Sequence, residues 1–242
     1  MTDWRDEAER WWTGVLRLPP GALRSGGVFP AGPVDHVGVL WVAGAPGPVI
    51  YGPGEVLSAV RTVAARAADG GADPDLAGLG RDLTAALGPR AGRLLGPAWY
   101  GYVGAGLLSA PPDGAAGPGT VRALGEADRP LLARLHEQAA AGEVAESGTD
   151  GLPAFGYVEA GALLAVACLG NWREMPTIGV LTHPGARRRG LAVRVVAAAA
   201  AAGLGQRAVV QYRAFSANTA SISVARRCGF AHYGDGLIID LQ

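Results

Sequence analysis

The segment 180–192 combines an apolar stretch with a short, basic turn of small residues. A strand is expected at Thr177–Leu181 and a turn at His183–Gly185, and Arg187-x-x-Gly190-x-Ala192 then begins a helix. The first N–H groups of a helix have no intrahelical acceptor, and the helix dipole adds about half a positive charge there. Small residues let an anion approach the backbone closely. The pattern therefore predicts a phosphate-binding site at a strand–helix junction.

The charge composition limits which anion this site could bind. The segment is not a P-loop, because it lacks the Gly-Lys-Ser/Thr ending. All 21 basic side chains are arginine, and 21 acidic residues balance them to a net charge of zero. This balance argues against nucleic acid as a partner. Arginine without lysine, among abundant Ala, Gly and Pro, is also typical of GC-rich coding, so each single arginine is weaker evidence of function.

Composition predicts a globular, cytoplasmic protein. The chain has 242 residues, of which 49% are hydrophobic, enough for one large or two small domains. Cys168 and Cys228 lack metal-ligand spacing, so no metal is expected and a reducing compartment fits. The charged N-terminus does not resemble a signal peptide, and the alanine run 192–202 is too short to span a membrane. No membrane partner is therefore expected.

The first half of the chain alternates helical and strand-like patterns. Residues 3–17 carry their apolar side chains on one helical face, with three tryptophans among them, which predicts a helix packed on a core. We interpret residues 1–110 as a smaller α/β domain. Further strands are expected at Val37–Val42, Val49–Tyr51 and Ala98–Val103, and helices at Val56–Ala68 and Leu79–Leu87.

A segment rich in Gly, Ala and Pro predicts an interdomain linker at 111–118, followed by a second domain at 119–242. Asp128 is expected to cap the helix 129–141, and Asn218 a helix that ends at Arg227. The order of elements predicts an α/β (α+β) fold with a mixed sheet. The other expected elements are strands 120–124, 154–159, 162–169, 208–214 and Leu237–Leu241, a helix 143–147 and a turn at Asn171–Pro176.

A second motif, at residues 218–230, follows the arginine-rich turn along the chain. It reads Asn218-x-x-Ser221-x-x-Val224-x-x-x-x-Gly229-Phe230. Together with Arg187-x-x-Gly190-x-Ala192 and the element order, it resembles the GNAT superfamily of N-acetyltransferases over residues 119–242. Residues 1–110 would then be an accessory domain, with a degenerate GNAT-like half as one option.

The resemblance implies an acyl-CoA site. In such proteins two central strands splay apart, and the pantetheine arm enters the gap while the pyrophosphate binds the helix start. Arg187 and Arg189 would be the main side-chain contacts, and Arg188 is equally well explained as a solvated surface residue. The implied CoA-binding residues are Val180, Leu181, Thr182, Arg187, Arg188, Arg189, Gly190, Leu191, Ala192, Val193, Asn218 and Ser221.

The proton-transfer residues are less clear from the sequence. A base of the family often lies just before the strand that leads into the arginine loop, where Glu174 stands, with Glu159 or water as alternatives. The backbone N–H near Leu181 or Thr182 would stabilise the oxyanion. The family's usual acid, a tyrosine four residues before the Gly of Gly-Phe, is replaced here by Ala225. Tyr212, Tyr233 or water could substitute, whereas Cys228 is expected to be a small buried residue.

The short C-terminus leaves room for one strand where the family usually has two. Only twelve residues follow Phe230. An uncovered sheet edge would be prone to aggregation. We therefore expect the N-terminal domain or a partner subunit to cover it, and the acceptor cleft to include residues from 1–110. Trp172, beside Glu174, is a candidate for lining that cleft, or else a core residue.

These observations favour an enzyme that transfers an acetyl or related acyl group from acyl-CoA to an amine of a small molecule or peptide, by direct attack in a ternary complex. Acetyl-CoA would be a co-substrate, and a homodimer is compatible with this interpretation. The alternative is a GNAT-fold acyl-CoA sensor or assembly subunit with weak catalysis, which Ala225 supports. The zero net charge disfavours a third option, an arginine-based nucleic-acid-binding module.

Overall fold

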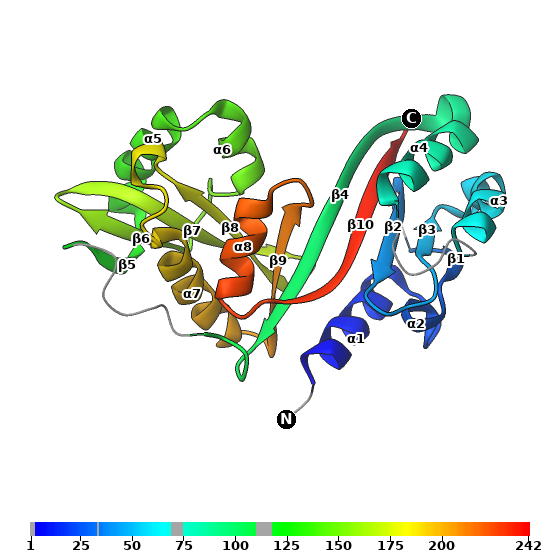
Figure 1. Ribbon diagram of the computed structural model, residues 1–242, viewed down its shortest axis with the longest axis horizontal. Helices are drawn as coiled ribbons and strands as arrows, with labels where there is room; N and C mark the ends of the chain where they lie inside the picture. The colour runs from blue at the N-terminus through cyan, green and yellow to red at the C-terminus, as the bar shows by residue number, and fades with distance from the viewer. Residues whose placement is uncertain (1–2, 33, 69–74, 110–117) are drawn as a thin grey trace. The chain divides into compact units, whose positions relative to one another are not determined.

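The computed structural model describes residues 3–32, 34–68, 75–109 and 118–242, which form two compact units (Figure 1). The first unit comprises the chain up to Tyr100 together with Ala214–Thr219 and His232–Gln242. The second comprises Gly101–Arg213 and Ala220–Ala231. Apart from Pro118, the linker expected at 111–118 lies outside the described residues.

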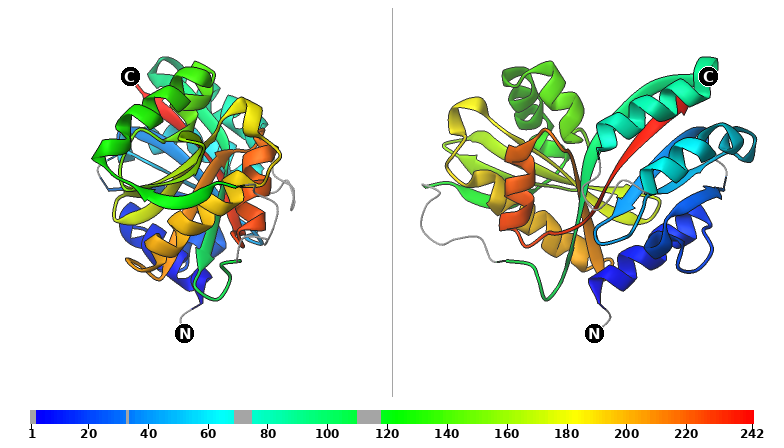
Figure 2. Two further views of the ribbon diagram at one scale, coloured as in Figure 1. Left: turned by 90° about the vertical axis from the view of Figure 1, so that its left-hand side faces the viewer. Right: turned by 45° about the vertical axis from the view of Figure 1, so that its right-hand side comes forward.

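The first unit contains a mixed sheet in the order β1, β3, β2, β10, β4 (Figure 2). Strand β1 is parallel to β3, whereas β2 runs antiparallel to β3 and to β10. Helices α3 and α4 pack their apolar side chains onto residues of β2, β3 and β10. Its elements are α1 (Trp4–Leu16), α2 (Ala22–Ser25), β1 (Gly27–Pro30), β2 (His36–Val42), β3 (Val49–Gly52), η1 (Gly54–Val56), α3 (Leu57–Ala68), α4 (Leu76–Leu87), η2 (Gly88–Arg90), most of β4 (Ala91–Gly104) and of β10 (Ala231–Leu241).

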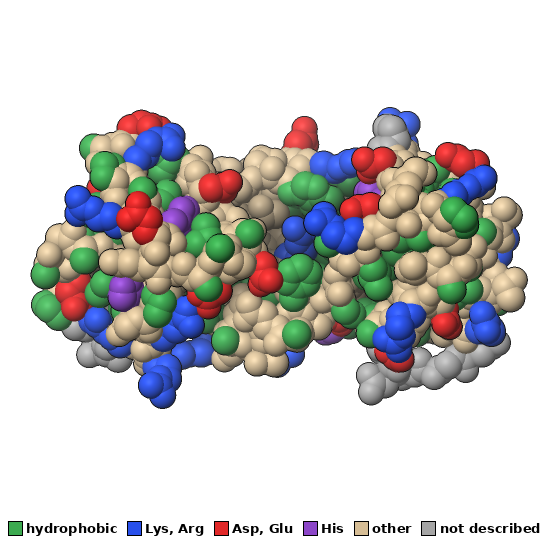
Figure 3. Space-filling view, turned by 90° about the horizontal axis from the view of Figure 1, so that it is seen from above, with side chains coloured by type: hydrophobic (Ala, Val, Ile, Leu, Met, Phe, Trp, Pro, Cys, Tyr) green, Lys and Arg blue, Asp and Glu red, His purple; other side chains and the backbone are tan. Residues whose placement is uncertain are grey.

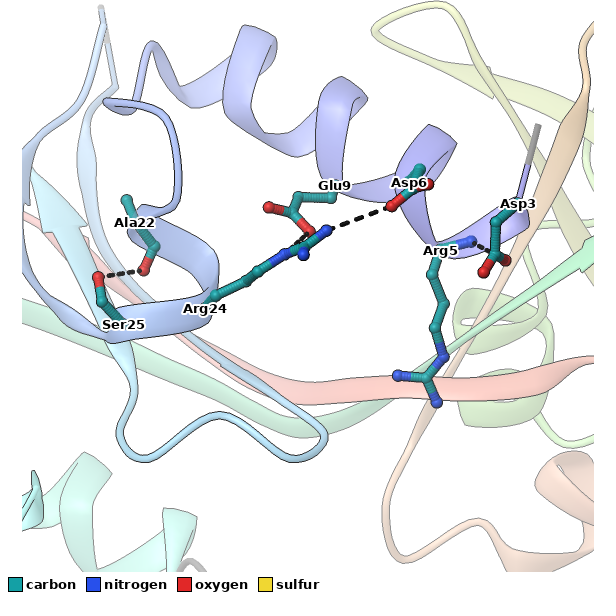
Figure 4. Close-up of polar contacts among 7 residues, drawn as sticks. All are labelled: Asp3, Arg5, Asp6, Glu9, Ala22, Arg24 and Ser25. Carbon is teal, nitrogen blue, oxygen red and sulfur yellow. Dashed lines mark hydrogen bonds and ion pairs between the residues drawn. The ribbon is translucent and has the colours of Figure 1, made fainter.

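Helix α1 forms as its apolar spacing predicts, with Trp11 and Trp12 buried. The Asp3 side chain caps its start by accepting a hydrogen bond from the N–H of Arg5 (Figure 4). On its polar side, the Arg24 guanidinium contacts Glu9 at 2.7 Å and Asp6 at 3.2 Å. These contacts tie α2 to α1. Helix α2 and strand β1 were not predicted, because four residues are too few to show a periodicity.

Strand β2 covers the edge of β10 that the short C-terminus was expected to leave open. Residues Gly234–Asp240 of β10 pair with Val42–His36 of β2, inside the first unit. The expectation that residues from 1–110 cover this edge is confirmed. Strand β10 is longer than the predicted Leu237–Leu241, because glycines that interrupt the apolar pattern nonetheless continue the ladder. Strand β4 also begins earlier than the predicted Ala98.

The second unit contains a mixed sheet in which β9, β8, β7, β6 and β5 follow one another. Neighbouring strands are antiparallel except β8 and β9, which are parallel. The order of elements agrees with the predicted α/β fold. They are β5 (Thr120–Leu124), η3 (Glu126–Asp128), α5 (Arg129–Gln138), α6 (Ala141–Ser147), β6 (Ala154–Glu159), β7 (Ala162–Trp172), β8 (Met175–Thr182), η4 (Pro184–Ala186), α7 (Leu191–Leu204), β9 (Val209–Phe215) and α8 (Thr219–Arg227).

Helices α5 and α7 cover opposite faces of this sheet. Cys168 of β7 belongs to the apolar cluster that includes Leu132 and Leu135 of α5. Its neighbour Leu169 lies beside Gly203 of α7. Successive side chains of a strand point to opposite faces. The strands that lead to the arginine-rich loop are therefore buried between two helical layers.

Two local expectations need correction. The turn predicted at Asn171–Pro176 contains only Arg173 and Glu174, because β7 and β8 continue up to it on both sides. Both residues have positive φ, at 48° and 68°, which is the backbone of a two-residue hairpin turn. Asp128 precedes α5 as predicted, but its carboxylate binds the Arg122 guanidinium and the Gly125 N–H instead of capping the helix.

The surface carries both signs of charge. Figure 3 shows arginine and acidic side chains interspersed over the visible face, consistent with the net charge of zero. Among the described residues, no helix is long and apolar enough to cross a membrane.

The β2–β10 pairing predicts a strong effect of adding a side chain at Gly236. A Cβ there would lie 2.5 Å from the Val39 carbonyl oxygen, so the backbone would have to move. Gly236→Val should lower stability by about 1–3 kcal/mol, or roughly 2–4 °C in Tm per kcal/mol. The control is Gly14→Ala in α1, where a Cβ meets nothing within 4 Å and Tm should rise. Equal Tm values for both variants would contradict this pairing.

Candidate functional site

Strands β8 and β9 separate in the middle of the second unit. Along β7, β8 is paired from Met175 to Thr182. In the described chain, its ladder with β9 holds only Thr177–Gln211 and Ile178–Tyr212. Beyond Ile178 the two parallel strands diverge, so this side of β8 offers unpaired backbone groups. This is the splayed arrangement that the family resemblance implies.

The N–H and C=O groups of successive β8 residues point alternately toward β7 and toward the gap. The His183 N–H donates to the Leu164 carbonyl of β7 at 2.9 Å. Because alternate residues of an antiparallel pair point their N–H and C=O groups to opposite sides, Leu181 also faces β7, whereas Val180 and Thr182 face the gap. Of the two expected oxyanion donors, Thr182 is thus suitably directed and Leu181 is not. The Leu181 side chain lies in the core with α5.

The end of α6 fixes β8 where the gap begins. A Cβ added at Gly179 would lie 2.1 Å from the Ser147 carbonyl oxygen, so only glycine fits under this helix end. The Ser147 hydroxyl lies 2.7 Å from that of Thr149, and the His136 Nε2 lies 3.1 Å from the same Thr149 oxygen. This buried polar chain connects α5, the end of α6 and the turn that follows.

The loop after β8 ends in an uncapped helix start. The His183 Nδ1 accepts a hydrogen bond from the Gly185 N–H at 3.0 Å and so fixes the first turn. Arg188 and Gly190 then adopt positive φ values of 64° and 76°. Gly190 occupies the N-cap position of α7, and no described side chain caps this helix start. The first-turn N–H groups of Leu191, Ala192 and Val193 are therefore available to an anion.

Two of the three loop arginines are held by carboxylates. The Arg187 Nη2 contacts Glu143 Oε1 of α6 at 2.7 Å, and the Arg189 Nη2 contacts Glu159 Oε2 of β6 at 2.5 Å. The Arg189 guanidinium and the Tyr157 hydroxyl lower the pKa of Glu159, so it remains charged at neutral pH. A carboxylate with a lowered pKa is a poor general base, which weakens that alternative for Glu159. Arg188 is exposed.

Tyr212 is a residue of β9 whose side chain contacts α8. Its hydroxyl is 2.9 Å from the Ser221 Oγ, and its ring packs edge-on against Phe230 with a centroid distance of 5.3 Å. Burial raises the pKa of Tyr212 to about 12, so the phenol keeps its proton at neutral pH. Ser221 and Ala225 are four residues apart and share a face of α8. Tyr212 thus places a hydroxyl beside the helix face where the family's tyrosine is missing.

The remaining candidates lie elsewhere. Glu174 is at the tip of the β7–β8 hairpin, where its side chain is 83% exposed and contacts the Arg207 Nη2 at 2.7 Å. It is six residues from Val180 along β8, or roughly 20 Å at strand spacing, so the structure does not bring it to the gap. Half-buried Trp172 ends β7 beside this turn. Asn218, directly before α8, and buried Tyr233 belong to the first unit.

The cysteines are buried, as expected for Cys228. The Cys228 Sγ donates to the Val193 carbonyl of α7 at 3.4 Å, and burial raises its pKa to about 12. Burial likewise raises the pKa of Cys168 to about 11. Within the described ranges, no three His, Cys, Asp or Glu side chains gather to hold a metal ion.

Three residues that shape the site were not predicted from the sequence: Glu143, Tyr157 and Gly179. Glu143 precedes Arg187 by 44 residues, so no local pattern connects them. The Tyr157 hydroxyl accepts from the Gly119 N–H at 3.0 Å and donates to Glu159 at 3.1 Å. The glycine in the apolar run Ile178–Leu181 was the one available signal, because an isolated glycine in a strand often marks a close backbone approach.

Comparisons with known proteins find one matching family and several similar solved structures. Residues 125–230 match the acetyltransferase (GNAT) family. Similar solved structures include a protein described as a GNAT-family acetyltransferase from Novosphingobium aromaticivorans (22% identity, TM-score 0.46, covering 62% of this chain and 65% of that one). Others are a GNAT-family acetyltransferase from Colwellia psychrerythraea (15%, 0.46, 65% and 60%) and a GCN5-related N-acetyltransferase from Kribbella flavida (18%, 0.48, 71% and 68%).

The chain thus spans less than two thirds of the length of the first two of these proteins. No curated protein matches it in sequence.

The raised pKa of Tyr212 predicts its titration behaviour. Because the folded pKa of about 12 exceeds the ordinary value of 10.0, the stability that this burial provides is complete below pH 10 and is lost as pH rises toward 12. In a phenolate absorbance titration, Tyr212→Phe and the wild type should give superimposable curves up to about pH 11. If the wild type shows a titration step near pH 10 that the variant lacks, Tyr212 is solvated.

Proposed function

We propose that this chain, whose residues 125–230 match the acetyltransferase (GNAT) family, transfers an acetyl or related acyl group from acyl-CoA to an amine of a small molecule or peptide. One observation carries the proposal: the gap that opens after Ile178 leads directly into the uncapped start of α7. A thioester arm with a diphosphate at its end needs these two features in this order.

The proposed binding mode uses backbone groups first. The pantetheine amides would pair with the N–H and C=O groups of Val180 and Thr182, as a strand would. The pyrophosphate would accept hydrogen bonds from the first turn of α7, where Gly190 leaves the approach open. The contribution of Asn218 remains part of the proposal, because the second motif of the family includes it.

The proposed chemistry is direct attack in a ternary complex. The amine nitrogen forms a bond to the thioester carbonyl carbon, and the Thr182 N–H stabilises the oxyanion. The carbon–sulfur bond then breaks, the amine releases its proton to water, and the thiolate takes one up. Tyr212, which keeps its proton at neutral pH and lies 2.9 Å from the Ser221 Oγ, would be the proton donor. Glu174 is not assigned as the base.

The second candidate function is an acyl-CoA sensor or assembly subunit. Two observations favour it: Ala225 replaces the usual tyrosine, and the Glu174 carboxylate is engaged with Arg207 away from the gap. The two functions share the binding step and differ in turnover.

Turnover separates the two functions. With acetyl-CoA and a panel of primary amines, an enzyme should release free CoA thiol in proportion to an acetylated amine identified by mass spectrometry. Glu174→Gln should change this rate less than twofold, about 0.4 kcal/mol. Tight acetyl-CoA binding without product across the panel would favour the sensor, whereas no acetyl-CoA binding would contradict both.

Gly190 gives a direct test of the binding mode. Gly190→Leu should reduce acetyl-CoA affinity by at least about tenfold, because a side chain would block the approach to the helix start. The matched control is Gly161→Leu in the β6–β7 turn, which also has positive φ and open space around it. Both variants should lose about 1–2 kcal/mol of stability. Unchanged affinity of Gly190→Leu in calorimetry would contradict the assignment of the loop.

A further inference from the structure

The loop 187–190 holds three consecutive arginines that differ in their surroundings. The Arg187 guanidinium contacts both carboxylate oxygens of Glu143, at 2.7 and 2.9 Å, and the Arg189 guanidinium contacts Glu159. Among the described residues, no carboxylate pairs with Arg188. The two flanking charges are therefore compensated, and the middle one is not.

The two carboxylates that contact the loop arginines come from two different elements. Glu143 lies on α6, whose end packs over Gly179 of β8. Glu159 ends β6 and also accepts the Tyr157 hydroxyl, which in turn accepts the Gly119 N–H. The side chains of Arg189 and Glu159 are only 33% and 21% exposed. Partial burial and a further hydrogen bond make this pair a firmer anchor than a solvated one.

The backbone between the two pairs is strained. Arg188 has a φ of 64°, in the left-handed region that is unfavourable for a residue with a side chain. Gly190 has a φ of 76° two residues later. Left-handed residues next to other conformations turn successive N–H groups toward one side, which creates an anion-binding concavity. Holding Arg187 and Arg189 at both ends keeps the strained residue in place.

We propose that Glu143 and Glu159 are positioning residues that hold Arg187 and Arg189 so that the loop presents its N–H groups and the uncompensated Arg188 to the phosphates of acyl-CoA. The inference rests on the proposed function. It differs from the sequence-based expectation, in which Arg187 and Arg189 are the main side-chain contacts and Arg188 is either a CoA contact or a solvated surface residue.

The alternative, in which the carboxylates weaken acyl-CoA binding, predicts the opposite change in Kd when they are removed. If the two carboxylates merely competed with phosphate for the arginines, removing them would free two cations and tighten acyl-CoA binding. If they position the loop, removing them weakens binding although the local charge becomes more positive. The direction of the change in Kd therefore decides between the two.

The test compares Glu159→Gln, Glu143→Gln and Arg188→Met with the wild type in calorimetric titrations with acetyl-CoA. Each variant should bind about tenfold more weakly, because a displaced binding group loses most of its contribution. Glu126→Gln, which breaks the exposed Glu126–Arg129 pair on the same unit, is the matched control and should bind within twofold of the wild type. Unchanged or tighter binding by both Glu143→Gln and Glu159→Gln would overturn the proposal.

A second ligand separates positioning from general damage. Acetyl-pantetheine lacks the phosphates, so its turnover or binding by the three variants should match the wild type within twofold. An equal loss with both ligands would mean that the variants damage the fold or the gap, and the proposal would fail. In a double-mutant cycle of Glu159→Gln with Arg189→Met, the double variant should lose less acetyl-CoA affinity than the sum of the two single losses, because Glu159 acts through Arg189.

Binding of acetyl-CoA by the wild-type protein tests the proposed function separately from the role of the two glutamates. If wild-type protein does not bind acetyl-CoA, the proposed function fails. If it binds and the glutamate variants do not weaken binding, only the positioning role fails. If Glu159→Gln does not fold, the Glu143→Gln variant on the surface of α6 still tests the positioning role.

Discussion

The β8–β9 ladder ends after Ile178, and the backbone groups that it leaves unpaired define the candidate site. A parallel pair that stops early leaves backbone groups inside a sheet without partners, a costly arrangement unless something else binds them. Helices α5 and α7 cover the faces of this sheet, so the unpaired groups open only along the strand direction. An extended molecule with amides along its length satisfies such groups as a strand would.

Gly179 connects the gap to the arginine loop through α6. Because this position has no side chain, the carbonyls of Ser147 and Gly148 can lie against β8, and α6 is held close to the sheet. The same helix carries Glu143, which contacts Arg187. One glycine in a strand therefore allows the close approach of α6, which in turn carries the carboxylate that holds a loop arginine.

Local patterns predicted most elements of the fold, whereas contacts between distant residues were not predictable. The helices α1, α3 and α7 and the strands β6 and β9 follow from periodicity and turn residues within short windows. The turn at Arg173 and Glu174 was predicted too long, because neither residue is one of the Gly or Asn residues that usually mark positive φ. The pairs Arg187–Glu143 and Arg189–Glu159 join residues 44 and 30 positions apart, so only the folded chain shows them.

The burial of both cysteines has a practical consequence for measuring thiols in this protein. Cys168 and Cys228 are 3% and 0% exposed, and their pKa values of about 11 and about 12 leave almost no thiolate at neutral pH. A disulfide reagent added to the folded chain would therefore react slowly with the protein and rapidly with any free small-molecule thiol. The same reagent would react with two further thiols per chain once the protein unfolds, which makes cysteine labelling an internal reporter of unfolding of the second unit.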